Sequence, residues 1–318
     1  MPPGTDYHSD HAPGEWLLVK PRDLALMALL SFIWGASFIL IRISGQAFSP
    51  VWVGIGRLAF GSAFLWVLLK VQGGRTPPVS KLPVVLLVAF FNNAIPFVFF
   101  PWGERTVPSN LAAILNAMTP IFSTIISFML ADSRLSARAT AGVGLSMLGV
   151  MLAVSGTLRI GWGSPLGVGV IVIAALGYAI ATMIAKRALR GFDPVGLATT
   201  QLTWALVMLL PVGLLMGAPT QIQVAPILAL AGLGVFGSGV AYWLYYSLLS
   251  RVSATQTVAV TFIVPIWGQF WGFVAGEPVG WASIAGVAVV LAGLSLLNAR
   301  PAQRLAHPVD LAAGPTRP

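Results

Sequence analysis

The sequence contains few of the residues from which soluble enzymes build their sites. Among 318 residues there is no cysteine, and only 8% of the residues carry a charge. Without cysteine the chain can form neither a disulfide bond nor a thiolate metal site. The three histidines, His8, His11 and His307, all lie close to the chain ends, which argues against a buried histidine metal site. Soluble domains carry about 25% charged residues, so the low charge indicates a membrane protein.

Carboxylates are also missing from the middle of every long apolar stretch. Glu104, Asp132 and Glu277 lie only at the ends of such stretches. Proton-driven carriers usually need a buried carboxylate or histidine, so we expect facilitated efflux or exchange rather than proton coupling. Glu104 is the alternative proton carrier, but the adjacent Arg105 favours a structural ion pair.

Constellations that could carry out catalysis are absent from the sequence as well. The chain shows no pairing of nucleophile and base, no phosphate-binding glycine loop and no cluster of metal ligands. Gly142-Val143-Gly144 lies within an apolar helix and lacks the preceding strand that a dinucleotide site requires. We therefore expect no catalytic residue, no cofactor and no metal. An intramembrane enzyme is an alternative, but it would lack an acid or base to work with.

Apolar residues, by contrast, make up 57% of the chain, and the mean hydropathy is +0.87. A helix that crosses a bilayer needs about 20 apolar residues. Ten segments meet this requirement, and proline or glycine clusters separate most of them. We therefore predict an all-α integral membrane protein with ten transmembrane helices. The predicted segments are 24–44, 51–71, 82–103, 109–131, 137–156, 165–186, 194–217, 224–249, 253–276 and 279–298.

Lysine and arginine predict the orientation, because cytoplasmic loops of membrane proteins are enriched in both. If the N-terminus is cytoplasmic, fourteen of these residues fall on the cytoplasmic side, and only Arg42, Arg105 and Arg159 fall on the other. Arg57 is left inside a segment. We therefore expect both termini to be cytoplasmic. The net charge of +9 then belongs to cytoplasmic loops and not to a nucleic-acid surface.

The chain is internally duplicated between two short tails, 1–22 and 300–318, which lack core-forming residues. Residues 1–15 also lack the apolar core and small-residue cleavage site of a signal peptide. A stripe of small and polar residues in segment 109–131 recurs about 145 positions later, where proline falls on proline. The first stripe is Ser109, Ala113, Asn116, Pro120, Ser123 and Ser127, and the second is Ala254, Val258, Thr261, Pro265, Gly268 and Gly272.

The duplication predicts two five-helix repeats, 23–157 and 158–299. Matches at an offset of 144 support it, such as Gly149 with Gly293. Because five is an odd number, the second repeat enters the membrane from the opposite side. Inverted repeats of this kind, with a substrate site near the midplane between them, are typical of transporters.

Several motifs resemble those of the drug/metabolite transporter superfamily of the EamA type. They are Phe32-Ile33-Trp34-Gly35-Ala36-Ser37-Phe38, Arg57-Leu58-Ala59-Phe60, Gly276-Glu277-Pro278, Ala285-Gly286-Val287 and Gly293. The resemblance covers about residues 22–299. It implies a ten-helix carrier in a bacterial inner membrane, often an exporter of amino acids or other small metabolites, with a central cavity between its halves.

Polar and aromatic side chains inside the segments are the candidate substrate contacts, because such groups usually face the bundle or a water-filled cavity. Trp34 and Trp267 lie deep enough to contact an apolar or aromatic part of a substrate. The predicted substrate-binding residues are Trp34, Arg57, Asn92, Asn116, Tyr178, Tyr242, Thr261 and Trp267.

Arg57 has two possible roles that the sequence leaves open. It lies about 10 Å into its segment at 1.5 Å per residue. It could be the counter-charge for a substrate carboxylate. Alternatively it snorkels to the outer surface or holds carbonyl groups of a neighbouring helix. Its repeat partner, 144 positions later, is Gln201, so the position is polar in both halves but charged in only one.

Three prolines are predicted hinges for alternating access. Proline has no N–H, so the carbonyl four residues earlier loses its partner, and lipid cannot satisfy that carbonyl. We expect Asn116 and Thr261 to face each other across the repeat axis, with Asn92 beside them at the cavity wall. The hinges are Pro96, Pro120 and Pro265, and the freed carbonyls belong to Asn92, Asn116 and Thr261.

Taken together, these features predict an inner-membrane carrier that exports small metabolites, amino acids or similar, by alternating access through a central cavity. The expected partners are a small-molecule substrate and the lipid bilayer, without nucleic acid. The oligomeric state stays open, and a monomer would suffice. A channel-like facilitator is the second alternative, which single-channel currents would favour and saturable exchange would not.

Overall fold

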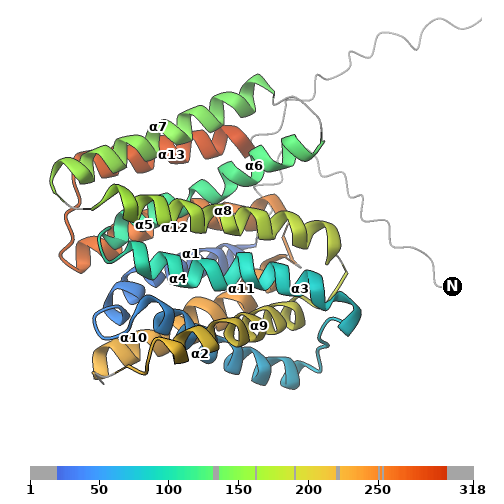
Figure 1. Ribbon diagram of the computed structural model, residues 1–318. Helices are drawn as coiled ribbons and strands as arrows, with labels where there is room; N and C mark the ends of the chain where they lie inside the picture. The colour runs from blue at the N-terminus through green and yellow to red at the C-terminus, as the bar shows by residue number, and fades with distance from the viewer. Residues whose placement is uncertain are drawn as a thin grey trace, which may run out of the picture.

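The computed structural model describes residues 20–131, 136–161, 163–189, 191–219, 223–249, 251–252 and 254–298, and every regular element within them is helical (Figure 1). Most of the two predicted tails and Asp132 lie outside these residues. Eight helical stretches are long and apolar enough to cross a membrane, and two shorter apolar helices cover Val260–Val274 and Trp281–Leu297. The predicted all-α fold with ten membrane-crossing segments is therefore confirmed.

Three of the ten crossings are not continuous α-helices. In the first half they are the third and fourth crossings, and in the second half it is the third. The first half comprises α1 (Pro21–Ser44), α2 (Pro50–Gln72), the 3₁₀ turn η2 (Val79–Lys81), α3 (Leu82–Ala89), the π-helical turn η3 (Phe90–Ala94), α4 (Ile95–Gly103), α5 (Ser109–Asn116), α6 (Met118–Ala131) and α7 (Ala137–Arg159). The second comprises α8 (Pro165–Ala188), α9 (Pro194–Leu215), α10 (Val224–Gly234), the π-helical turn η4 (Val235–Val240), α11 (Ala241–Leu249), α12 (Ala254–Val274) and α13 (Trp281–Asn298).

Proline defines the first residue of four of these helices, where its missing N–H costs nothing and its fixed φ suits a helix. The prolines are Pro21, Pro50, Pro165 and Pro194. Side-chain oxygens cap three of these starts. Ser49 accepts a hydrogen bond from Trp52 N at 3.5 Å, Ser164 accepts one from Gly167 N at 3.0 Å, and Asp193 accepts one from Val195 N at 3.0 Å. These caps supply acceptors for N–H groups that have no partner within the helix.

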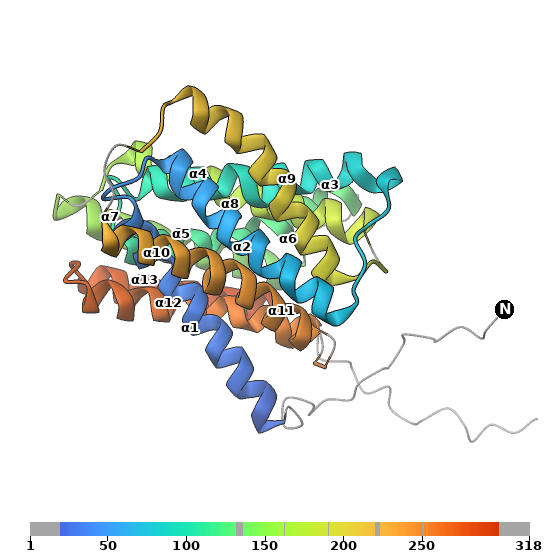
Figure 2. The same cartoon turned by 90° about the horizontal axis from the view of Figure 1, so that it is seen from below.

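Successive crossings alternate in direction, so α1 begins and α13 ends at the same end of the bundle. We call this the proximal end, and the opposite end, on the left in Figure 1, the distal end. Equivalent helices of the two halves pack against each other: α2 against α9, α5 against α12, and α7 against α13 (Figures 1 and 2). Such pairing is what a two-fold axis between the halves produces.

The α7–α13 pair shows this symmetry at the level of single residues. A Cβ atom on Gly142 would lie 2.9 Å from the Gly293 carbonyl oxygen, and one on Gly149 would lie 2.7 Å from the Gly286 carbonyl oxygen. Gly286 and Gly293 are the repeat equivalents of Gly142 and Gly149, so exchanging the halves maps each of these two contacts onto the other. Small residues let the two backbones approach closely, as in other membrane helix pairs.

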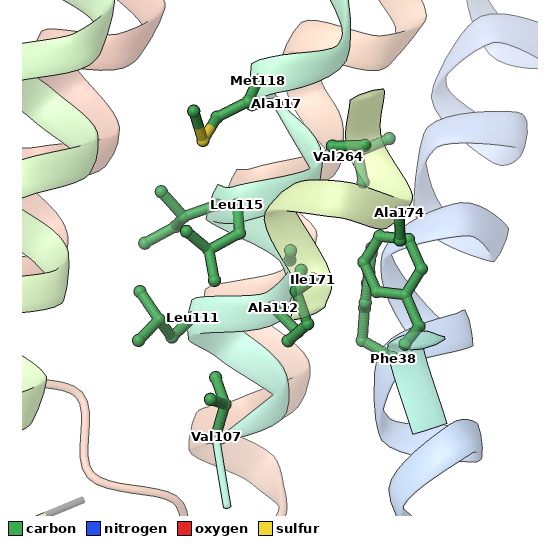
Figure 3. Packing of buried hydrophobic residues seen from close by; sticks show 14 of the residues in the cluster. Phe38, Val107, Leu111, Ala112, Leu115, Ala117, Met118, Ile171, Ala174 and Val264 are labelled. Atoms are coloured by element: carbon green, nitrogen blue, oxygen red, sulfur yellow. The ribbon is translucent and has the colours of Figure 1, made fainter. Parts of the chain in front are cut away.

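The short helix α5 lies at the centre of the largest apolar cluster. Its residues from Ser109 to Leu115 are all buried. Side chains from α1, α8 and α12 surround it, among them Phe38, Ile171 and Val264 (Figure 3). Because neighbouring helices cover α5 on all sides, this helix has no lipid-facing stripe and can carry small and polar residues among the apolar ones.

The helix changes around the three predicted hinge prolines differ from one another. Pro120 follows the break at Ala117 that separates α5 from α6, and Pro96 is the second residue of α4, which begins directly after the π-helical turn η3. Pro265 lies inside the continuous helix α12. Whether these prolines act as hinges stays a prediction.

Candidate functional site

Arg57 projects from α2 into the bundle and contacts the second half of the chain. Its Nε donates a hydrogen bond to Ser238 Oγ at 2.9 Å, and its Nη2 donates one to the Gly237 carbonyl at 3.4 Å. The guanidinium carbon lies 3.8 Å from the centre of the Phe97 ring, a favourable cation–π contact. Only 8% of the residue is exposed, so it does not snorkel to the surface.

A second group of hydrogen bonds joins η3 to α9 and α11. Asn92 Nδ2 donates to Gln201 Oε1 at 3.3 Å and to the Tyr242 hydroxyl at 3.1 Å. Asn93 Nδ2 also donates to the Tyr242 hydroxyl, at 3.3 Å. Tyr242 therefore connects the third crossing of the first half with the third crossing of the second.

These two groups of contacts are related by the internal duplication. Gln201 is the repeat equivalent of Arg57, at an offset of 144, and Ser238 is the equivalent of Asn93, at an offset of 145. In each case the second helix of one half contacts the π-helical turn of the other half. We call Arg57, Asn92, Asn93, Gln201, Ser238 and Tyr242 the paired network.

The two π-helical turns occupy the same place in both repeats. Residues 90–94 of η3 fall on 235–239 of η4 at an offset of 145. π-helical turns are rare and often lie at functional sites. Close packing brings α2 to η4, since a Cβ on Gly61 would lie 3.1 Å from both the Gly234 carbonyl oxygen and Ser238 Cβ.

The structure brings together three of the predicted substrate contacts, Arg57, Asn92 and Tyr242, around the paired network. The ring of Tyr178, on α8, lies 6.0 Å from that of Phe100 on α4. Thus Tyr178 lies beside the helix that continues from η3.

The other predicted contacts take no part in the hydrogen bonds that define the paired network. The Trp34 ring lies 5.7 Å from that of Tyr245. Trp267 Nε1 donates to Ser31 Oγ at 3.1 Å, which fixes this indole against α1. Asn116 and Thr261, at the end of α5 and on α12, make none of the hydrogen bonds of the paired network. Their roles in substrate contact stay predictions.

Sequence reasoning missed Gly237, Ser238 and Phe97 as members of the site. A Gly-Ser-Gly run in an apolar segment is typical of helix packing, and nothing in it suggests a partner for an arginine. The signal that could have found it is the repeat offset, which aligns Asn93 with Ser238.

Another polar cluster lies at the distal end of the bundle. The carboxylate of Glu277 accepts hydrogen bonds from Ser109 N at 2.9 Å, Ser109 Oγ at 2.9 Å and Asn110 N at 3.0 Å. It also pairs with Arg42 Nε at 3.3 Å. A carboxylate at the start of α5 meets unpaired N–H groups and the positive end of the helix dipole. We call Arg42, Ser109, Asn110 and Glu277 the distal clamp.

Glu104, at the same end, differs from the expectation of an ion pair with Arg105. Glu104 is only 4% exposed, whereas Arg105 is exposed. Neither carboxylate oxygen of Glu104 has a hydrogen-bond partner. The expected ion pair is wrong because the Arg105 side chain faces away from the bundle, where water can solvate it.

At the proximal end, a shallow hollow of about 430 Å³ lies between the loops that precede α3 and α9. It is lined by Gly73, Gly74, Arg75, Thr76, Gly191, Phe192 and Asp193. Asp193 accepts a hydrogen bond from Arg75 N at 3.0 Å, which ties the two halves together. Among the residues that the structure describes, no three acidic or histidine side chains gather in a way that could hold a metal ion.

Comparisons with known proteins match this architecture over nearly the whole chain. A probable terminal-alkyne amino-acid exporter of Streptantibioticus cattleyicolor is 25% identical over 86% of this chain and 92% of its own length. The uncharacterised inner membrane transporter YedA of Escherichia coli is 25% identical over 87% of this chain and 92% of its own length. An uncharacterised transporter of Archaeoglobus fulgidus is 23% identical over 86% of this chain and 97% of its own length.

A solved crystal structure shares the fold, with a TM-score of 0.64 at 16% identity over 87% of this chain and 96% of its own. The sequence model of the EamA-like transporter family matches twice, at residues 23–155 and again at residues 165–299. Family and relatives identify a membrane transporter and not an enzyme. The chain therefore belongs to the EamA-like transporter family.

Proposed function

We propose that this transporter exports amino acids or similar small metabolites across a bacterial inner membrane, with both termini in the cytoplasm. The proposed route is alternating access, with the paired network as the substrate site between the two repeats. One relative is named as a probable amino-acid exporter and another as an inner membrane transporter. The distribution of lysine and arginine supports the orientation.

The observation that carries this proposal is the set of partners around Arg57. In the part of the chain that the structure describes, its guanidinium contacts a hydroxyl, a carbonyl and an aromatic ring, and it forms no ion pair with a carboxylate. A buried cation inside a membrane is costly without a counter-charge and usually marks a substrate or ion pathway. A substrate carboxylate would provide that counter-charge, and arginine can bind it through two parallel hydrogen bonds.

The paired network also offers a way to couple binding to movement. A carboxylate bound to Arg57 would compete with Gly237 and Ser238 for the same N–H groups. Binding would then loosen the contact between α2 and η4, while the amide groups of Asn92 and Gln201 meet the remaining polar atoms of the substrate. Because each contact joins opposite repeats, loosening one allows the halves to move relative to each other.

The test compares Arg57→Gln with Arg57→Lys in cells that overproduce the protein. Cells are first fed dipeptides to raise their internal amino acids, and the amino acids released into the medium are then measured. The glutamine variant should lose export by about tenfold or more, as expected for a lost charge-assisted hydrogen bond. Its level in the membrane should stay normal. The lysine variant keeps the positive charge but cannot form the two parallel hydrogen bonds of a guanidinium group, so it should retain part of the activity.

Gln201→Leu is the matched control, because it removes the repeat-equivalent contact without removing a charge. It should lower export less than Arg57→Gln does. Undiminished amino-acid export by the Arg57→Gln variant would show that the carboxylate of the substrate is not bound there.

A further inference from the structure

Glu104 is a buried carboxyl group that the proposed transport route does not use. It is the first residue after the membrane-crossing stretch Val79–Gly103 and caps the end of α4, where its N–H donates to the Phe100 carbonyl at 2.9 Å. Only 4% of it is exposed, and both side-chain oxygens lack a hydrogen-bond partner. An ionised carboxylate without donors is strongly disfavoured in such surroundings, whereas a protonated one is tolerated.

The ionisable groups around Glu104 come from four other parts of the fold. Three of them act on its charge: Arg42 from α1, Arg57 from α2 and Glu277 from the loop before α13. The fourth, Tyr178 on α8, contacts the ring of Phe100, four residues before Glu104. Burial is the main cause that raises the pKa of Glu104 well above its ordinary range, and the Glu277 carboxylate raises it further. Arg42 and Arg57 oppose this effect but do not outweigh it.

The two glutamates compete for one arginine. Arg42 pairs with Glu277 at 3.3 Å and forms no ion pair with Glu104 among the described residues. Glu277 thus forms one ion pair, with Arg42, and accepts three hydrogen bonds from Ser109 and Asn110 at the start of α5. These four contacts hold the distal clamp together. Arg42 pairs with Glu277 alone only while Glu104 is neutral, because two adjacent carboxylates cannot both be ionised at low cost.

We propose that Glu104 is a proton-binding site that controls the distal clamp. With the proton bound, Glu104 leaves Arg42 to Glu277, and the clamp stays closed. When the proton leaves to water, the new anion repels Glu277 and attracts Arg42. The clamp then loosens, and the distal end of α5 becomes accessible. The proposal concerns protons alone and does not depend on which metabolite is transported.

The first experiment reads the protonation state of Glu104 directly. The chain contains only three glutamates, Glu15, Glu104 and Glu277, so labelling glutamate with ¹³C at the side-chain carboxyl gives three signals in the carbon NMR spectrum. The variants Glu15→Gln and Glu277→Gln serve only to assign two signals by their disappearance, because loss of the Glu277 carboxylate itself changes the pKa of Glu104. The titration is carried out on the unmutated protein in lipid nanodiscs. The remaining signal should be that of a protonated acid at about pH 7, well above the ordinary range near 4.3. A signal from an ionised Glu104 at that pH would overturn the proposal.

The second experiment measures opening of the distal end and exploits the absence of cysteine. Ala112→Cys introduces one thiol on α5, at a position that is fully buried, and its reaction rate with a maleimide is followed as the pH rises. The matched control is Ile160→Cys, which lies at the same end and is 54% exposed. Dividing the two rates removes the pH dependence of thiol ionisation.

The rate ratio should rise by about tenfold as Glu104 loses its proton, a change that corresponds to a tenfold shift in the open population. Adding Glu104→Gln to the Ala112→Cys protein should keep the ratio low at every pH, because glutamine stays neutral. A ratio that does not change with pH, or that rises equally in the Glu104→Gln protein, would contradict control of the clamp by this residue. Either result would leave the proposed export of amino acids untouched.

Discussion

At the scale of single residues, the hydroxyl of Tyr242 accepts hydrogen bonds from two amides, those of the buried Asn93 and the half-buried Asn92. Asn93 is fully buried and its Oδ1 has no hydrogen-bond partner, so the contact of its Nδ2 with Tyr242 is the hydrogen bond of that side chain. Asn92 shares the same hydroxyl but also donates to Gln201. A buried amide left without a partner costs about 1–3 kcal/mol.

We therefore expect Tyr242→Phe to lower the thermal stability of the purified protein, with a loss of about 1–3 kcal/mol. Tyr245→Phe is the matched control on the same helix, because Tyr245 contacts Trp34 and Tyr246 through its ring. Both variants are heated in the same detergent, and the fraction of protein that remains monodisperse is measured at each temperature. Equal melting temperatures for the two variants would show that the Tyr242 hydroxyl contributes little.

At the scale of elements, the contact between α7 and α13 depends on glycines that face the partner helix. A Cβ on Gly149 would lie 2.6 Å from Val290 N and 2.7 Å from the Gly286 carbonyl oxygen. Both atoms belong to backbone and cannot turn aside. Gly144, on the same helix, has nothing within 4 Å of such an atom.

Gly149→Ala should therefore push the two helices apart and destabilise the protein by about 1–3 kcal/mol. Gly144→Ala should cost nothing and can stabilise α7, because alanine favours a helix over glycine by about 1 kcal/mol. The readout is the melting temperature of each variant. A Gly149→Ala protein as stable as Gly144→Ala would mean that α13 can shift without loss of packing.

Most elements could be predicted from the sequence, but their contacts could not. Apolar length and proline positions predicted ten segments, and the loss of the Asn116 carbonyl's partner agrees with the helix break at Ala117. The π-helical turn η4 contains no proline and only one polar side chain, Ser238, so no local pattern indicates it. The pairing of Arg57 with that turn depends on how α2 packs, and the isolation of Glu104 depends on residues far away in the chain. Such facts arise from tertiary packing, which single-sequence patterns do not contain.

At the scale of the whole molecule, the inverted-repeat prediction makes a definite statement about which loops face the cytoplasm. A reporter that is active only in the cytoplasm should be active when fused after Pro78, Gly191 or Pro318, because lysine and arginine are concentrated on that side. Fused after Gly161, it should be silent. The activity of each fusion, normalised to its amount in the membrane, tests the prediction. An active reporter after Gly161 would show that the loop between α7 and α8 is cytoplasmic. The two halves would then not be inverted relative to each other.

The unlike residues at equivalent places of the paired network have a consequence for how the two halves must be joined. A homodimer of the first half would set two copies of Arg57 opposite two copies of Asn93, the equivalent of Ser238, and so bury two guanidinium groups in the membrane interior, at a high cost. A homodimer of the second half would set Gln201 opposite Gly237, the equivalent of Asn92, and place no cation in this network. Compared with these two homodimers, the fused chain provides one guanidinium for each paired network. Covalent linkage of the two unlike halves therefore sets the stoichiometry of charge in this network.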